Sequence, residues 1–402
     1  MYSECGNGIT APKGFRASGI HSGIKKAKKD LAIVFSEGPA NAAGVFTTSK
    51  VQAAPVLVCK QQLKRSGPFR AILVNSGNAN ACTGERGLND AWAMVERVAS
   101  GFGIGRNEVL VSSTGVIGQY LPMDRITNGI PAAISGLTPE GHLSAAEAIM
   151  TTDTFSKELA VHVTLDDVEV TIGGMAKGSG MIAPNMATML AFITTDAAIS
   201  TELLTYSLRR AADRSFNRIT VDGDTSTNDM VLILANGMAG NKELADPTTM
   251  SFQKFYDALE YLLVRLSKMI VLDGEGATKF VEIEVVGALT EDAAVRAARA
   301  IANSSLVKTA IHGEDANWGR ILAAVGYSGI EFDPAEVEIL FGDVPILRRN
   351  YSIYFSEEAA KRVLCQKEIR ITVNLHQGPH TALFWTCDLS REYVAINANY
   401  RT

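Results

Sequence analysis

Thr188 lies in a stretch of unusual composition, because residues 177–190, KGSGMIAPNMATML, are rich in glycine, proline and methionine. A threonine can serve as an enzyme nucleophile without a neighbouring histidine when it is the first residue of a chain, since its own α-amino group is then the general base. The unperturbed pKa of such an amine, ~7.7–8.0, leaves a useful fraction neutral at working pH. Thr188 is internal, so this chemistry requires that the Ala187–Thr188 bond be cut first.

The hydroxyl of Thr188 could make that cut itself. Attack on the preceding carbonyl gives an ester by an N→O shift, hydrolysis of the ester frees the amine, and a strained local backbone would assist. The competing interpretation is that Thr188 is a strand residue, because an internal threonine before an apolar run usually is one. Residue types alone therefore favour the strand interpretation.

Glycine-bearing polar clusters follow several strand-like runs and indicate where a ligand could bind. Glycine lets the main chain approach a ligand closely, and successive backbone amides can hold an anion or a developing oxyanion. One such cluster alone would be typical of a turn, whereas five in one chain favour a site. None of them matches the phosphate-binding pattern GxxxxGK[ST]. The clusters are residues 75–87, 112–118, 173–180, 221–229 and 272–279.

Composition narrows the class of protein. The chain of 402 residues has 38 Lys+Arg and 43 Asp+Glu, and a net charge of -5 does not favour nucleic acid. No apolar run is long enough to span a membrane. The five cysteines form no CxxC pair and the six histidines no HExxH, so neither a disulfide framework nor a metal site is predicted. We expect a cytoplasmic, soluble protein whose partners are small molecules rather than nucleic acid or a membrane.

Hydrophobic periodicity predicts both strands and amphipathic helices. Several strands follow one another without an intervening helix, which favours mixed or antiparallel sheets over a doubly wound parallel one. The expected fold class is therefore α+β, a layered sandwich of mixed sheets flanked by helices. The predicted strands are 31–35, 71–77, 107–115, 159–165, 168–174, 280–288 and 369–375, and the predicted helices are 88–103, 201–216, 251–270 and 292–304.

The tetrapeptide Ala187-Thr188-Met189-Leu190 resembles the cleavage motif of the ornithine acetyltransferase family, the bifunctional glutamate N-acetyltransferases of arginine biosynthesis. The resemblance covers essentially the whole chain, with minor departures such as Ser49. It implies a fold like that of the N-terminal-nucleophile hydrolases and self-cleavage into chains 1–187 and 188–402, which fold together as one catalytic unit and assemble as an α2β2 heterotetramer. Further segments that resemble family signatures are 74–84, 112–118, 151–154, 217–229, 306–320 and 396–402.

The resemblance also implies roles for single residues. Thr188 would be the nucleophile, and Thr114 with Gly115 would form the oxyanion hole, where a hydroxyl and an adjacent glycine amide point at one oxygen. Without the resemblance, Thr114 and Gly115 read as a strand-end turn and Lys177 as a solvated lysine. Thr152 could make the substrate contact that is assigned to its neighbour Thr151. The substrate-binding positions are Thr151, Lys177, Thr188, Glu275, Asn397 and Thr402.

Two of these positions have a direct physical use. Lys177 could pair with a substrate carboxylate and, by charge repulsion, lower the pKa of the Thr188 amine. Glu275 could attract and orient the side-chain ammonium of ornithine.

The implied reaction is ping-pong acetyl transfer from N2-acetylornithine to glutamate through an acetyl-Thr188 ester. The C-terminal segment 396–402 could close over that ester and exclude water. No cofactor is implied, although acetyl-CoA could be a second acetyl donor. Two alternatives remain: a self-cleaving aminopeptidase or amidase of related fold, and an uncleaved homologue that binds a small molecule without catalysis.

Overall fold

The computed structural model describes residues 2–65, 67–183, 189–353 and 355–399. The chain forms two compact units, the first comprising Met1–Asn217 with Asp224–Ile270 and the second Arg218–Gly223 with Val271–Thr402. The division between the units does not coincide with the predicted cleavage bond. Residues on both sides of Ala187–Thr188 therefore contribute to the first unit.

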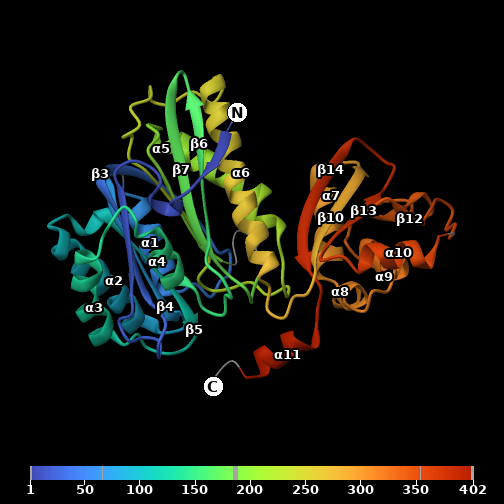
Figure 1. Ribbon diagram of the computed structural model, residues 1–402, viewed down its shortest axis with the longest axis horizontal. Helices are drawn as coiled ribbons and strands as arrows, with labels where there is room; N and C mark the ends of the chain where they lie inside the picture. The colour runs from blue at the N-terminus through green and yellow to red at the C-terminus, as the bar shows by residue number, and fades with distance from the viewer. Residues whose placement is uncertain (1, 66, 184–188, 354, 400–402) are drawn as a thin grey trace. The chain divides into compact units, whose positions relative to one another are not determined.

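The first unit is built on a nine-stranded sheet in which β3 changes partners along its length (Figure 1). Leu31–Phe35 of β3 pairs with β4, and Asn41–Phe46 pairs with β9, with a register shift between the two halves. The strand order is β1-β6-β7-β8-β9-β3-β4-β5, with β2 paired to β3. The bounds are β1 Tyr2–Cys5, β2 Phe15–Ile20, β3 Leu31–Phe46, β4 Phe69–Asn78, β5 Val109–Val116, β6 Lys157–Leu165, β7 Val168–Lys177, β8 Leu190–Thr195 and β9 Met230–Ala235.

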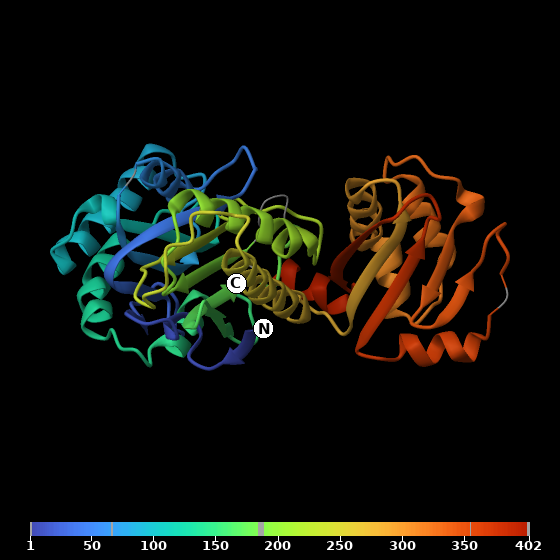
Figure 2. The same cartoon turned by 90° about the horizontal axis from the view of Figure 1, so that it is seen from above.

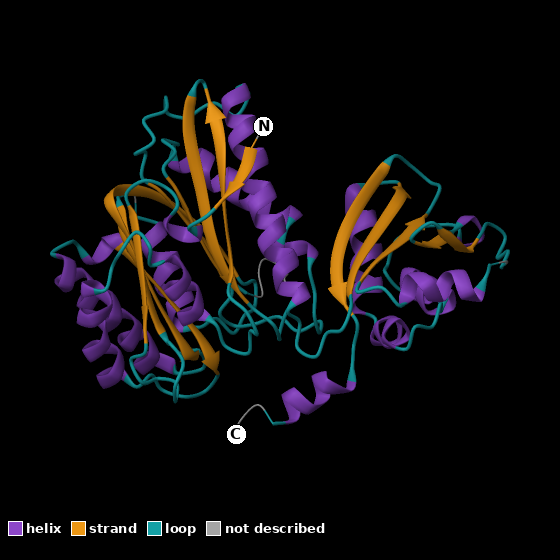
Figure 3. Cartoon of the chain, viewed as in Figure 1, coloured by secondary structure: helices purple, strands orange, loops and turns teal. Residues whose placement is uncertain are grey.

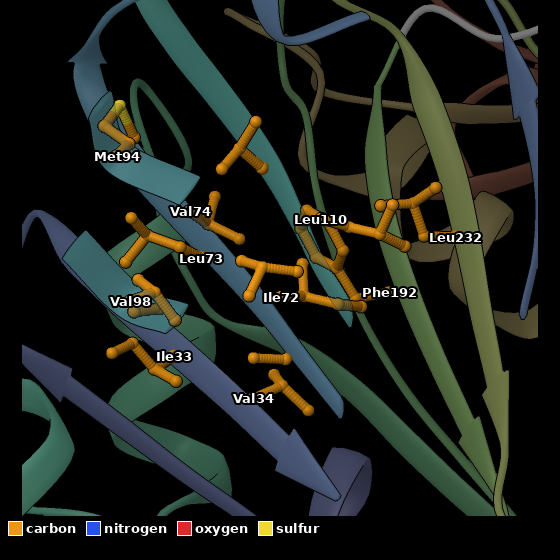
Figure 4. Close-up of a cluster of buried hydrophobic side chains, with 14 of the residues drawn as sticks. Ile33, Val34, Ile72, Leu73, Val74, Met94, Val98, Leu110, Phe192 and Leu232 are labelled. Carbon is orange, nitrogen blue, oxygen red and sulfur yellow. The ribbon is translucent and has the colours of Figure 1, made fainter. Parts of the chain in front are cut away.

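The two halves of this sheet share one hydrophobic core. Figure 4 shows Phe192 of β8 and Leu232 of β9 in the same cluster as Ile72 of β4 and Leu110 of β5. All four side chains are fully buried, and burial of each such side chain stabilises the fold by about 1.5–3 kcal/mol. The half-sheets therefore pack face to face as the layers of a sandwich.

Helices cover this sandwich. The apolar stripe of α2, which includes Met94 and Val98 at the spacing of one helical turn, faces the core (Figure 4). Beside β7, α6 packs so closely that a side chain at Gly174 would meet Leu262 and Leu266, and both views show the yellow helix along the green strands (Figures 1 and 2). The helices of this unit are α1 Ala54–Leu63, α2 Gly84–Phe102, α3 Met123–Ser135, α4 His142–Ile149, α5 Thr201–Arg214 and α6 Met250–Leu272, the last ending just past the unit boundary.

The second unit contains strands flanked by helices (Figure 3). They form a five-stranded mixed sheet with strand order β12-β11-β13-β10-β14. Val281, Ile283 and Val285 of β10 are buried against helices, whereas Glu282 and Glu284 lie on the opposite, polar face. The strands are β10 Phe280–Ala288, β11 Glu338–Phe341, β12 Val344–Leu347, β13 Glu368–Asn374 and β14 His380–Cys387. The helices are α7 Glu291–Asn303, α8 Ser305–His312, α9 Trp318–Gly326, α10 Glu357–Leu364 and α11 Arg391–Ala398.

Both sheets combine parallel and antiparallel neighbours, because β4–β5, β8–β9 and β10–β13 are parallel and most other pairs are antiparallel. The predicted α+β class with mixed sheets is confirmed. Each predicted strand and helix is present, usually with bounds that differ by a few residues. Short 3-10 helices occur at Gly8–Thr10, Arg106–Glu108, Phe216–Arg218 and Pro334–Glu336. Among the described helices, none has both the length and the apolar character needed to cross a membrane.

Candidate functional site

Lys177 and Thr114 meet in the first unit. Lys177 is the last residue of β7 and Thr114 lies near the end of β5, and the Nζ atom of Lys177 donates a hydrogen bond to Oγ1 of Thr114 at 3.3 Å. Each residue is only 8% exposed. Lys177 is thus a buried lysine rather than a solvated one, and the structure brings together two residues that were predicted to serve the same reaction.

Gly115, beside Thr114, occupies a position that no other residue could fill without strain. Its φ is 132°, and a Cβ atom there would collide with the backbone of Gly77, its register partner in β4. The β4–β5 ladder is irregular at this point, where Asn78 pairs with two positions of β5. Such an irregularity changes the direction of side chains and backbone amides at the end of a strand. An oxyanion hole needs donors that point at one oxygen, and a reoriented amide can meet that need.

The carboxylate of Asp153 ties two predicted segments together. It is 3% exposed, its Oδ1 accepts from Gly178 N at 2.7 Å, and its Oδ2 accepts from Thr151 N at 2.9 Å. The Lys157 ammonium, which is fully buried, lies 2.7 Å from the same carboxylate. Burial would raise the pKa of Asp153, but Lys177, Lys157 and these hydrogen bonds hold it below its usual range.

Thr151 enters this network through its backbone. Its N–H contacts Asp153, and both Thr151 and Thr152 are half-buried. This contact does not choose between the two hydroxyls as a substrate ligand, so that assignment stays a prediction.

Asp229, which the sequence analysis did not identify as a site residue, is a fully buried carboxyl at the start of β9. It directly precedes Met230, whose N–H donates to Met189 O at 3.1 Å in the parallel β8–β9 ladder. Oδ2 of Asp229 has no hydrogen-bond partner among the described residues, and burial raises the pKa of this carboxyl well above its usual value. A buried carboxyl with a raised pKa thus lies beside Met189, the residue that follows Thr188 in the chain.

Within the second unit, Glu275 and Asn397 are hydrogen-bonded to each other. The Nδ2 atom of Asn397, in α11, donates to Oε2 of Glu275 at 2.8 Å, and Glu275 is 8% exposed. Ser390 caps α11 and donates to Gly276 O at 2.6 Å, which fixes the helix against the loop that carries Glu275. Two predicted substrate-binding residues therefore meet in this unit.

Three predicted positions, Ala187, Thr188 and Thr402, lie outside the described residues. Of the segment expected to close over the ester, residues 396–398 form the end of α11. No group of three histidine, cysteine, aspartate or glutamate side chains in the described part of the chain could hold a metal ion. All five cysteines are free thiols in the structure.

A buried hydroxyl beside a glycine amide, in contact with a lysine ammonium, is a combination that can stabilise the oxyanion of an acyl-transfer enzyme. The model of the ArgJ family matches residues 16–402. The chain therefore belongs to the ArgJ family, which confirms the family and the enzymatic character predicted from the sequence.

Relatives match along almost the whole chain. A protein of Symbiobacterium thermophilum named arginine biosynthesis bifunctional protein ArgJ is 54% identical, and the match covers 98% of each chain. A protein of the same name from Caldanaerobacter subterraneus subsp. tengcongensis is 51% identical over 98% of each chain. Among solved structures, the chain is similar to the ornithine acetyltransferase of Mycobacterium tuberculosis, whose crystal structure is a complex with ornithine. The sequence identity is 46%, the match covers 46% of this chain and 100% of that chain, and the TM-score is 0.44.

Proposed function

We propose that this enzyme transfers the acetyl group of N2-acetylornithine to glutamate, giving ornithine and N-acetylglutamate. The observation that carries the proposal is the 54% identity, over 98% of the chain, with a relative named for arginine biosynthesis. In the first half-reaction Thr188 Oγ1 bonds to the acetyl carbon, the amide C–N bond breaks, and the ornithine amine leaves with a proton. In the second, the glutamate amine attacks the ester carbon and loses a proton, the ester C–O bond breaks, and Thr188 Oγ1 regains a proton as its hydroxyl.

The contact between Lys177 and Thr114 supports an oxyanion role for Thr114. Because the Lys177 ammonium has only donors, Thr114 Oγ1 must be the acceptor in their 3.3 Å contact. The hydroxyl proton of Thr114 is then free to point at a second acceptor, and the ammonium charge polarises the hydroxyl towards donation. A developing oxyanion bound by this proton and by the Gly115 amide would be stabilised by about 2.7–4 kcal/mol per donor.

Self-cleavage at Ala187–Thr188, giving chains 1–187 and 188–402, is part of the proposal. The tetrapeptide Ala187-Thr188-Met189-Leu190, which resembles the cleavage motif of the family, supports it. The sheet is compatible with a cut, since β7 precedes the bond, β8 follows it, and Lys177 pairs with Leu190 in their antiparallel ladder. Two fragments cut at this bond would stay joined by that ladder and by the shared core. We further propose that two copies of each fragment assemble as an α2β2 heterotetramer in the cytoplasm.

The remaining predicted residues are proposed to select the substrate. Glu275 carries a negative charge and would bind the side-chain ammonium of ornithine, with Asn397 holding the carboxylate in place at 2.8 Å. Thr151 and Thr402 would complete the contacts to substrate. Acetyl-CoA is proposed as a second acetyl donor to glutamate, in keeping with the word bifunctional in the names of the relatives, and no resident cofactor is proposed.

A transfer assay tests this function. Purified protein is incubated with N2-acetylornithine labelled in the acetyl group, with and without glutamate, and the labelled products are separated. Label in N-acetylglutamate is expected only when glutamate is present. N-acetylnorvaline, which lacks the side-chain ammonium, is the matched control donor and should react poorly. Release of labelled acetate at the same rate with and without glutamate would identify an amidase. The absence of any labelled product would identify a binding protein.

A further inference from the structure

Asp30 organises a loop of the first unit that the proposed mechanism does not use. Its carboxylate is fully buried and accepts hydrogen bonds from Ser22 N at 2.6 Å, Ser22 Oγ at 2.8 Å, Gly23 N at 3.1 Å and Lys25 N at 2.9 Å. The backbone of Asp30 also accepts from Ser76 N of β4 at 2.9 Å. These hydrogen bonds fix the backbone of Lys25 against the sheet, so they also define where its side chain begins.

The side chain of Lys25 reaches the residues already assigned to the site. Its Nζ donates to Met150 O at 2.6 Å and to Lys29 O at 2.9 Å. Its stem lies over Gly77, where a Cβ atom would approach Lys25 Cγ to 3.1 Å, and Gly77 is the register partner of Gly115. Lys25 therefore lies beside the proposed oxyanion hole and, through Met150, directly beside Thr151.

A short chain of hydrogen bonds also relates Lys25 to Lys177. Lys25 binds the carbonyl of Met150, and the N–H of the next residue, Thr151, binds Asp153. The other oxygen of Asp153 binds the N–H of Gly178, the residue after Lys177. The backbone segments next to both lysines are thus bound to one buried carboxylate, that of Asp153.

This region has more positive than negative charge. The pKa of Lys25 is lowered to about 8, chiefly by burial and also by repulsion from Lys28 and Lys177, while Asp30 and Asp153 oppose the decrease. With Lys25 itself, these are three ammonium groups against two carboxylates. An ammonium has three donors, and the two carbonyls are the only acceptors of Lys25 Nζ among the described residues. One donor and a surplus of positive charge are available to an anion.

We propose that Lys25 and Lys177 together form a dicarboxylate subsite that selects glutamate as the acetyl acceptor. The inference rests on the proposed function. N2-acetylornithine carries one carboxylate and glutamate carries two, so a pair of lysines matches the acceptor better than the donor. Lys177 binds the carboxylate common to both substrates, and Lys25 binds the carboxylate that only glutamate has.

The two half-reactions of Lys25→Gln distinguish a role in glutamate selection from a general effect on folding or catalysis. Loading of the enzyme by N2-acetylornithine should change by less than about twofold, whereas KM for glutamate in the discharge step should rise about tenfold or more. Discharge by glutamine, which lacks the second carboxylate, should be equally slow in the wild type and the variant. Lys26→Gln is the matched control, because Lys26 is an exposed lysine of the same loop, and it should leave both steps unchanged.

Two further measurements keep the test decisive. Lys25→Arg retains the charge and should retain most of the preference for glutamate over glutamine, even if Lys25→Gln folds poorly. Calorimetric binding of glutamate without any acetyl donor should weaken about tenfold in Lys25→Gln. If binding weakens but the wild type forms no acetyl-enzyme, the subsite stands and the proposed function fails. Equal losses for glutamate, glutamine and N2-acetylornithine, or no loss at all, would overturn the subsite.

Discussion

The Nζ atom of Lys177 lies 3.3 Å from Oγ1 of Thr114, although β8, β9, β3 and β4 separate their strands in the sheet order. Five strand spacings in a flat sheet would place the two strands about 24 Å apart. The register shift of β3 between Phe35 and Ala40 divides the sheet into two layers that face each other. Asn228, just before β9, connects the two layers, because its side-chain amide donates hydrogen bonds to Ala79 O at 2.6 Å and to Ser113 O of β5 at 2.7 Å.

Thr114→Ala should slow acetyl transfer by about two to three orders of magnitude, because it removes one donor to the oxyanion. The effect should appear in kcat more than in KM, since the donor acts on charge that develops in the transition state. Thr114→Ser keeps the hydroxyl and should retain most of the activity. Single-turnover kinetics of the cleaved proteins measure this, and a Thr114→Ala enzyme with normal turnover would show that Thr114 is structural.

Asp153→Asn should lower the free energy of unfolding by about 3–5 kcal/mol, because it removes the carboxylate that Lys157, itself fully buried, contacts at 2.7 Å. Glu147→Gln breaks the exposed pair between Lys29 and Glu147 and should change the free energy by less than about 1 kcal/mol. Urea titrations of both variants make the comparison. Similar small losses would mean that the Asp153 pair does not stabilise the first unit.

Asp229→Asn should alter the pH dependence of stability. Burial raises the pKa of Asp229, so the folded protein holds a proton that the unfolded chain releases above pH ~3.9. Stability of the wild type therefore falls as pH rises from there towards the folded pKa, whereas asparagine does not titrate. The melting temperature of the wild type, relative to Asp229→Asn, should decrease between pH 5 and pH 8.

Asp153→Asn provides the control for this pH series. The pKa of Asp153 is lowered in the folded state, so its contribution is complete above the unfolded value of ~3.9 and is lost only as pH falls through the folded pKa. The difference between wild type and Asp153→Asn should be constant from pH 5 to pH 8. An equally constant difference for Asp229→Asn would contradict the raised pKa.

Local patterns in the sequence predicted the local structure. Alternation in 280–288 and the three- and four-residue apolar spacing in 251–270 gave β10 and α6 nearly within their observed bounds. The bend of β3 and the strand order depend on contacts between distant segments, which no local period encodes. The family resemblance assigned Lys177 and Thr114 to the same reaction, but their direct contact was not predicted from the sequence.

Lys25, Asp153 and Asp229 were not identified from the sequence for a related reason. Each is a charged residue in a polar, glycine-containing or threonine-rich segment, where a solvated turn is the usual interpretation. Only the packing of several segments buries these groups, and burial together with neighbouring charges shifts the pKa of each one. The threonine-rich segment 151–154 resembles a family signature, but the resemblance predicted a role for Thr151 and none for Asp153.

Glu275→Gln should weaken loading by N2-acetylornithine more than discharge by glutamate, because the lost carboxylate is a charge-assisted partner for an ammonium that glutamate lacks. Loading should require about tenfold more donor. The amide can still accept the hydrogen bond from Asn397, so the fold of α11 should be retained. Half-reaction kinetics measure both steps, and equal damage to loading and discharge would assign Glu275 to the support of the nucleophile.

Thr188 is proposed to become an N-terminal acetyl carrier, and the masses of the two fragments are the sharpest test of that role. Wild-type protein should separate into fragments of 187 and 215 residues, about 20 and 23 kDa, whereas Thr188→Ala should remain a single chain. With N2-acetylornithine alone, the larger fragment should gain one acetyl group at Thr188, and added glutamate should remove it. An uncleaved wild-type chain, or an acetyl group on any residue other than Thr188, would rule out Thr188 as the acetyl carrier.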